Sequence, residues 1–197
     1  MSPPEDSDTK HDNSKPTPSN ESCYLNNPDK RAAISIDYHA PPSTRDKQIT
    51  HAVSLICPQM FSPHRSQKLS VSQLGGGLSN HLFIVSSSPA NDDDDDDSSS
   101  SKVLIRIHVS DDCHFVNRKK ETSILAHLAR EGKAPLLYGC FCNGRIEEFY
   151  SGAVTLTHSD IMTERYIEPV ARAMAGLHGM AGMNLGAEEE SSAVLEG

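Results

Sequence analysis

The chain has 197 residues, of which 36% are apolar and 5% aromatic with no tryptophan, so it can bury one modest hydrophobic core. Its formal net charge of −9 argues against a nucleic-acid-binding protein, although six of these charges lie in the run Asp92–Asp97 and without them the net charge is −3. The sequence shows no bilayer-spanning apolar segment, no signal-peptide pattern and only five scattered cysteines, so we expect a cytoplasmic protein with no membrane span and no disulfide framework.

The N-terminal region divides into a polar tail and a short helix. Residues 1–43 are rich in Ser, Pro, Asn, Asp and Lys and predict a disordered tail, because so few apolar side chains cannot offset the entropy of ordering. From Thr44, which offers a capping hydroxyl, to Cys57 before Pro58, the sequence predicts an amphipathic helix. Its apolar stripe consists of Ile49, Ala52, Val53 and Ile56.

A glycine-rich turn between two apolar runs is the most informative feature. We predict strands over residues 69–74 and 81–86, and the turn reads Gly75, Gly76, Gly77, Leu78, Ser79, Asn80 and His81. Glycine has no Cβ and adopts φ > 0 freely, so such a turn lets backbone N–H groups approach an anion. A Walker loop or a dinucleotide-binding fingerprint would open a helix, whereas this turn leads into a strand. The pattern favours a kinase-type lid over the phosphates of ATP.

The next elements complete a small α+β domain. Residues 86–101, which carry the acidic run between serines, predict a disordered loop insertion. Beyond it we expect a Val- and Ile-rich strand over 102–108, a helix over 114–130 ended by Gly132, and two strands flanking the hairpin signal Asn143-Gly144. Residues 44–150 therefore predict the small lobe of a protein-kinase-like fold, a five-stranded antiparallel sheet plus a helix inserted after the third strand.

The last part of the chain predicts the start of a helical large lobe. Residues 151–182 would supply a hinge and an amphipathic helix that Pro169 starts or kinks, and residues 183–197 a polar tail. Cys140 and Cys142 lie on one strand without a second pair of ligands nearby, so structural thiols are favoured over a metal site.

Two charged residues fit the phosphate-binding pattern of a phosphoryl-transfer fold. There the third strand supplies a cation to the phosphates, held by a carboxylate from the following helix, and Arg106 and Glu121 fit these positions. Alternatively, Arg106 points outward into solvent, and Glu121 is one of several carboxylates on a solvated helix face. Glu148, Phe149 and Tyr150 would form the hinge whose backbone meets the adenine, although Glu148 could equally be plain surface.

Five sequence blocks, in order and at compatible spacing, resemble the choline and ethanolamine kinases. They are Gly76-Gly-Leu-Ser-Asn80, Val103-Leu-Ile-Arg106, Ala134-Pro-Leu-Leu-Tyr-Gly139, Asn143-Gly-Arg-Ile-Glu-Glu-Phe149 and Leu177-His-Gly-Met180. The resemblance implies a protein-kinase-like fold, ATP with Mg²⁺, and transfer of the γ-phosphate to the hydroxyl of ethanolamine or choline, the first step of phosphatidylethanolamine or phosphatidylcholine synthesis. Residues 115–118 and 148–152 are more similar to the ethanolamine enzymes, whereas Gly-Leu-Ser-Asn is more similar to the choline ones, and the balance leans to ethanolamine.

The catalytic aspartates expected of such an enzyme are not found. Phosphoryl transfer requires an aspartate that accepts the hydroxyl proton and a second that holds Mg²⁺. Neither a His-Asn-Asp nor an Asp-Phe-Glu element occurs in the sequence, so we assign no catalytic or metal residue. We therefore expect an N-terminal fragment that is inactive alone, with the metal ligands in the missing lobe. The alternatives are an antibiotic phosphotransferase relative, a non-catalytic nucleotide-binding or dimer-forming module that pairs with a full-length kinase, and a plain interaction protein. A second copy of the chain, in a homodimer, is a further candidate partner.

Overall fold

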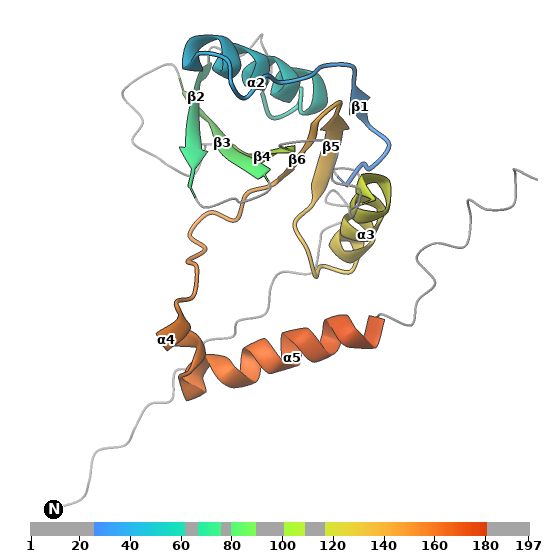
Figure 1. Ribbon diagram of the computed structural model, residues 1–197, viewed down its shortest axis with the longest axis vertical. Helices are drawn as coiled ribbons and strands as arrows, with labels where there is room; N and C mark the ends of the chain where they lie inside the picture. The colour runs from blue at the N-terminus through green and yellow to red at the C-terminus, as the bar shows by residue number, and fades with distance from the viewer. Residues whose placement is uncertain (1–25, 62–66, 76–79, 90–100, 109–116, 181–197) are drawn as a thin grey trace, which may run out of the picture.

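The computed structural model describes residues 26–61, 67–75, 80–89, 101–108 and 117–180 (Figure 1). Six short strands and four helices occur in this part of the chain. In order they are β1 (Arg31–Ala32), α2 (Pro42–Ile56), β2 (Gln67–Leu74), β3 (Asn80–Pro89), β4 (Lys102–His108), α3 (Arg118–Arg130), β5 (Leu137–Phe141), β6 (Gly144–Glu148), α4 (His158–Ile161) and α5 (Glu164–Met180). None of these helices is long and apolar enough to cross a bilayer.

One sheet organises the domain, with strand order β1-β5-β6-β4-β3-β2. All neighbouring strands are antiparallel except β1 and β5, which are parallel. The predicted α+β kinase-like class is confirmed, but the sheet has six strands rather than five. The additional strand β1 has only two residues, too few for an alternating pattern to be visible in the sequence.

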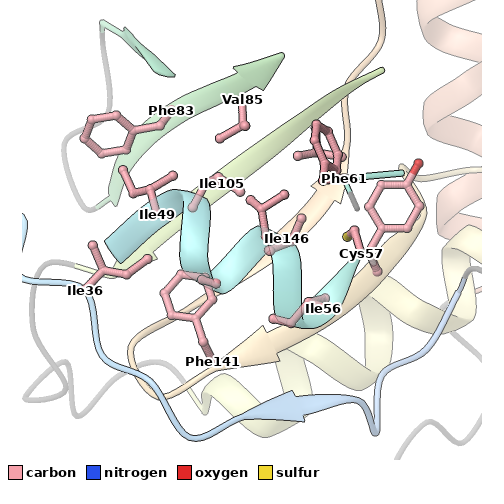
Figure 2. Close-up of a cluster of buried hydrophobic side chains, with 14 of the residues drawn as sticks. Ile36, Ile49, Ile56, Cys57, Phe61, Phe83, Val85, Ile105, Phe141 and Ile146 are labelled. Atoms are coloured by element: carbon pink, nitrogen blue, oxygen red, sulfur yellow. The ribbon is translucent and has the colours of Figure 1, made fainter. Parts of the chain in front are cut away.

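The two helices α2 and α3 cover opposite faces of the sheet. The predicted stripe of α2 is confirmed, since its four apolar residues are buried against β3, β4 and β6 (Figure 2). On the other face, Ala126 of α3 packs with Leu137 and Cys140 of β5. Side chains alternate between faces along a strand, so residues of β4 and β6 that do not enter the α2 core face α3.

The segment before α2 belongs to the folded domain from residue 26 on, which corrects the predicted tail up to residue 43. Arg31 pairs with Cys140, and Ile36 is only 1% exposed. The Asn143 side chain bonds both backbone groups of Ile36, accepting from its N–H at 3.0 Å and donating to its carbonyl at 2.8 Å. Composition alone misses this segment because it has few apolar residues, and their packing on the core and the pairing of β1 with β5 are long-range contacts. Residues 1–25 lie outside the described part.

Helix ends follow local chemistry and differ from expectation at two starts, because Pro41 and not Thr44 is the N-cap of α2, and α3 begins at Arg118 and not at residue 114. The N-cap of α2 is Pro41, without a side-chain cap, and the predicted capping residue Thr44 lies inside the first turn. Helix α3 begins after Asn117, whose side chain accepts from the Lys120 N–H at 3.0 Å. At its other end Gly132 has φ +66°, as expected for the predicted C-terminal glycine.

The two predicted hairpins are both present. Strands β2 and β3 pair in a register that sets Leu74 opposite Leu82, so the chain turns back between them as predicted, and β3 begins at Asn80. In the second hairpin Phe141 pairs with Gly144, so Cys142 and Asn143 are the two turn residues rather than Asn143 and Gly144. The predicted loop insertion lies largely outside the described residues; its described ends belong to β3 and to Ser101 before β4.

Beyond β6 the chain leaves the sheet. Residues 149–157 contain a turn at Ser151-Gly152 and lead to α4 and α5, and Figure 1 shows α5 apart from the sheet. Pro169 lies inside α5 rather than at its start. Three large apolar side chains of this helix are between 42% and 51% exposed, namely Ile167, Met174 and Leu177.

Candidate nucleotide-binding site

Arg106 lies on the sheet face that carries α3. Its strand neighbours Ile105 and Ile107 are fully buried in the core beneath α2, so Arg106 points to the opposite face. The register sets Arg106 between Leu82 of β3 and Arg145 of β6. Leu82, the residue opposite Arg106, lies two positions after Asn80, where β3 begins. Arg106 is therefore close to the end of the glycine-rich turn.

A chain of ion pairs runs from Arg106 to α3. Arg106 bonds the Glu147 carboxylate with two nitrogens, Nε to Oε1 at 2.9 Å and Nη2 to Oε2 at 3.3 Å. Arg145 donates from Nε to the same Oε1 and from Nη1 to Glu121 Oε1 at 2.9 Å. Arg118 closes the series by donating to Glu121 Oε2 at 2.9 Å. Within this series, three arginines and two glutamates leave one positive charge in excess.

Both carboxylates of this series are held ionised. Burial alone would raise the pKa of Glu147, but hydrogen bonds and charge from Arg106 and Arg145 outweigh it and hold the pKa below its usual value. Glu121 behaves alike: its burial raises the pKa less than the bonds from Arg118 and Arg145 lower it. The excess charge is thus a true cationic surplus, because no carboxylate is neutralised by protonation.

The direct partner of Arg106 differs from the predicted one. We expected the carboxylate from the following helix, Glu121, whereas the structure pairs Arg106 with Glu147 of β6 and connects it to Glu121 only through Arg145. The alternative that Arg106 points outward into solvent does not describe the structure either, since its side chain is only 24% exposed and forms an ion pair with Glu147. Sheet register decides this, because β6 lies directly beside β4.

A histidine and an asparagine join the two strands beside the turn. His108 lies opposite Asn80 in the β3–β4 register, and its Nδ1 lies 2.9 Å from Asn80 Oδ1. Because Oδ1 only accepts, Nδ1 carries the proton. Burial, followed by the charges of Arg118 and Arg145, lowers the pKa of His108 to about 4. The imidazole is therefore neutral at pH 7 and fixes the first residue of β3.

The other predicted residues of the turn divide into two groups. Gly75 directly follows β2, while Gly76, Gly77, Leu78 and Ser79 lie outside the described residues. The structure does not bring the His81 side chain to the Arg106 face. His81 stacks on Tyr38 with ring centroids 4.3 Å apart, and its opposite residue Ile107 is buried beneath α2.

The predicted hinge follows β6. Glu148, the first hinge residue, is also the last residue of β6. Its carboxylate accepts from the Leu136 N–H at 3.1 Å, and its N–H donates to the Leu136 carbonyl at 2.8 Å. Phe149 and Tyr150 then lead out of the sheet, and Tyr150 is 40% exposed. Glu148 is thus tied to the neighbouring strand, and the three residues lie where the sheet joins the extended segment.

Sequence reasoning missed four residues of this site, namely His108, Arg118, Arg145 and Glu147. The signal for two of them was present: Arg145 and Glu147 alternate with the buried Ile146, so they share one face of a strand next to the Arg106 strand. The described residues do not fit a Mg²⁺ site, since Glu121 and Glu147 are engaged by arginines and no group of three His, Cys, Asp or Glu converges there.

The sequence matches the choline/ethanolamine kinase family over residues 71–195. It is 31% identical to a choline kinase of Saccharomyces cerevisiae over 113 residues, covering 57% of this chain and 18% of the relative. To a probable choline kinase of Arabidopsis thaliana it is 29% identical over 134 residues, covering 68% of this chain and 37% of that protein. This chain thus spans well under half the length of these relatives.

Solved structures resemble the fold of this chain over about three quarters of its length. An ethanolamine kinase of Plasmodium vivax aligns with a TM-score of 0.56 and 25% identity, covering 72% of this chain and 35% of that one. A choline kinase of Cryptosporidium parvum aligns with a TM-score of 0.55 and 25% identity, covering 74% and 38%.

Proposed function

This chain belongs to the choline/ethanolamine kinase family, and we propose on that basis that it supplies the ATP-binding part of a cytoplasmic phosphotransferase acting on ethanolamine or choline. The reaction moves the γ-phosphate of ATP onto the amino-alcohol hydroxyl, the first step of phosphatidylethanolamine or phosphatidylcholine synthesis. Of the two substrates we favour ethanolamine, on the similarity of residues 148–152 to the ethanolamine enzymes.

The observation that carries this proposal is the cationic surplus beside the β2–β3 turn. Arg106 and Arg118 end the ion-pair series and are 24% and 27% exposed, whereas Arg145 is buried. Of the two end members, Arg106 lies opposite Leu82 of β3, close to the turn, so it is the one placed to meet an anion bound there. A guanidinium bonds phosphate oxygens through two parallel N–H groups, which makes arginine suited to a triphosphate. Mg²⁺, when bound with ATP, would neutralise charge on the transferring phosphate, and its ligands would come from outside the described residues.

Turnover by this chain alone is not part of the proposal. The sequence contains no His-Asn-Asp or Asp-Phe-Glu element to accept the hydroxyl proton or hold the metal. We therefore assign to this chain the binding of ATP, and to a larger lobe of the kind found in its relatives the acid–base step. In this proposal the chain is the N-terminal portion of such a kinase.

ATP titration of the purified chain tests the proposal. Arg106→Met should weaken ATP binding by about 10- to 100-fold, as expected for lost charge-assisted hydrogen bonds, and leave adenosine binding unchanged. Arg130→Met, an exposed arginine at the end of α3, is the matched control and should bind ATP normally. The proposal is contradicted if the wild-type chain does not bind ATP or if Arg106→Met binds ATP with equal affinity. Phosphorylation of ethanolamine or choline by the chain alone would contradict the assignment of the acid–base step to a larger lobe.

A second candidate function is a non-catalytic module that pairs with another kinase polypeptide or with itself. The exposed apolar residues of α5 favour it, because a helix that leaves Ile167, Met174 and Leu177 in water gains from a partner. Light scattering of the purified chain, and co-purification with an intact family kinase, would separate this candidate from the first. A monomer that binds ATP and retains no kinase would dismiss it.

A further inference from the structure

Glu147 is shared by two arginines in unlike surroundings. Its side chain is 3% exposed and accepts from Arg106 and from Arg145 at the same oxygen, Oε1. Arg106, at the edge of the group, is 24% exposed and bonds no other carboxylate among the described residues. Arg145 is 7% exposed and also bonds Glu121 of α3. Arg145 is therefore held by two carboxylates, whereas Arg106 has Glu147 as its single carboxylate partner among the described residues.

The difference matters when a phosphate approaches. A guanidinium that turns toward an anion must give up part of its bond to a carboxylate. Leaving a buried carboxylate without any cation is strongly unfavourable, because desolvation is no longer compensated. Glu147 keeps a cation when Arg106 turns away, since Arg145 stays bonded to it from the buried side.

We propose that Arg145 is a positioning residue: it neutralises Glu147 and anchors it to Glu121, so that Arg106 is free to leave Glu147 and bind a phosphate of ATP. This inference rests on the proposed function and deepens it. It assigns the two arginines different tasks, Arg106 as the exchangeable phosphate ligand and Arg145 as the fixed counter-charge. The register makes the division possible, because it sets Arg106 and Arg145 directly opposite each other on β4 and β6.

Nucleotide titrations test the assignment through a rescue. In Arg145→Met, Glu147 has Arg106 as its one remaining arginine, so Arg106 should stay bound to it and ATP affinity should fall at least tenfold. Adding Glu147→Gln removes the charge that holds Arg106, so the ATP affinity of the double variant should return to within about threefold of wild type. A merely structural role of Arg145 predicts no such recovery. Failure of the double variant to regain ATP affinity while it folds overturns the inference.

A second measurement needs neither nucleotide nor a folded Arg145 variant. In urea unfolding, Arg106→Met should lower the folding equilibrium constant about tenfold or less, because Arg145 still serves Glu147. Arg145→Met should lower it at least a hundredfold, because Glu147 and Glu121 both lose the buried arginine that joins them, and complete loss of folding agrees with this. Equal losses in the two variants overturn the inference. If the wild-type chain does not bind ATP, both the proposed function and the inference that Arg106 exchanges Glu147 for a phosphate are wrong. If the chain binds ATP but Arg106→Met and Arg145→Met lose equal stability, only the inference is wrong.

Discussion

Gly144 lies directly against the backbone of Arg106. A Cβ placed on Gly144 would lie 2.3 Å from the Arg106 carbonyl oxygen, and the Phe141 ring would be equally close at 2.4 Å. The φ angle of Gly144 is not positive, so the glycine serves close approach rather than an unusual turn conformation. The strand that carries Arg106 thus packs against its neighbour through a position that only glycine fits.

Gly144→Ala should destabilise the domain by about 3 kcal/mol or more, because the obstructing atom is backbone and cannot rotate away. Chemical denaturation measures this directly. Gly176→Ala in α5 is the matched control: nothing lies within 4 Å of its added Cβ, and alanine favours a helix interior by about 0.5–1 kcal/mol. A Gly144→Ala protein as stable as wild type would show that the close contact does not exist.

Stability should fall as the pH is lowered from about 6.5 to about 4, in part because of His108. The folded-state pKa of His108 is lowered to about 4 by burial and then by the charges of Arg118 and Arg145, while Glu121 opposes the shift and Arg106 adds the least to it. In this window the unfolded chain binds a proton that the folded chain does not, so protonation favours unfolding. The full linkage would be about 3 kcal/mol, and because the imidazole is only partly buried we expect about 1–2 kcal/mol.

The measurement for His108 is the free energy of unfolding at pH 7 and at pH 4.5. His108→Gln should show a smaller loss between the two than wild type, whereas His51→Gln, at an exposed position of α2, should lose as much as wild type. A His108→Gln protein with the wild-type pH dependence would exclude His108 as the source.

Asn143→Ala should cost about 2–4 kcal/mol of stability, because it leaves the N–H and carbonyl of the buried Ile36 without their side-chain partners. The loss should appear first as faster amide exchange at Ile36, whose own N–H donates to Asn143. Asn27→Ala, which removes the side-chain acceptor of the exposed Lys30 N–H bond, should cost much less. Equal costs for the two asparagines would contradict the anchoring of the N-terminal segment by Asn143.

Gly132→Ala should cost about 1 kcal/mol, since the residue has φ +66° and an open environment, so that only backbone strain opposes the methyl group. Two bonds depend on this conformation, Gly132 N–H to Ala129 at 3.0 Å and Lys133 N–H to Leu128 at 2.9 Å. Gly132→Asn should recover part of the loss because asparagine tolerates left-handed backbone better than alanine. Thermal unfolding of the two variants side by side checks the order.

The amino-acid sequence by itself determined the type and order of the elements from α2 to β6, the helix α5, the strand–turn–strand at the glycines, and the family, but not the short helix α4. These features depend on residues a few positions apart, such as the α2 stripe and the Gly132 helix end, and local backbone chemistry decides them. The same holds for Arg106 as the lone charge inside an apolar strand.

Only the tertiary structure decided which carboxylate meets Arg106 and which segment fills the sheet edge. Arg106 and Glu147 are 41 residues apart, and their contact exists because β4 and β6 pair in one register out of several that the sequence allows. Ile36 and Asn143 are 107 residues apart, so no local pattern connects the polar N-terminal segment with the core. Long-range pairing of this kind depends on the whole sheet, because each strand's register is fixed only by the packing of both its faces.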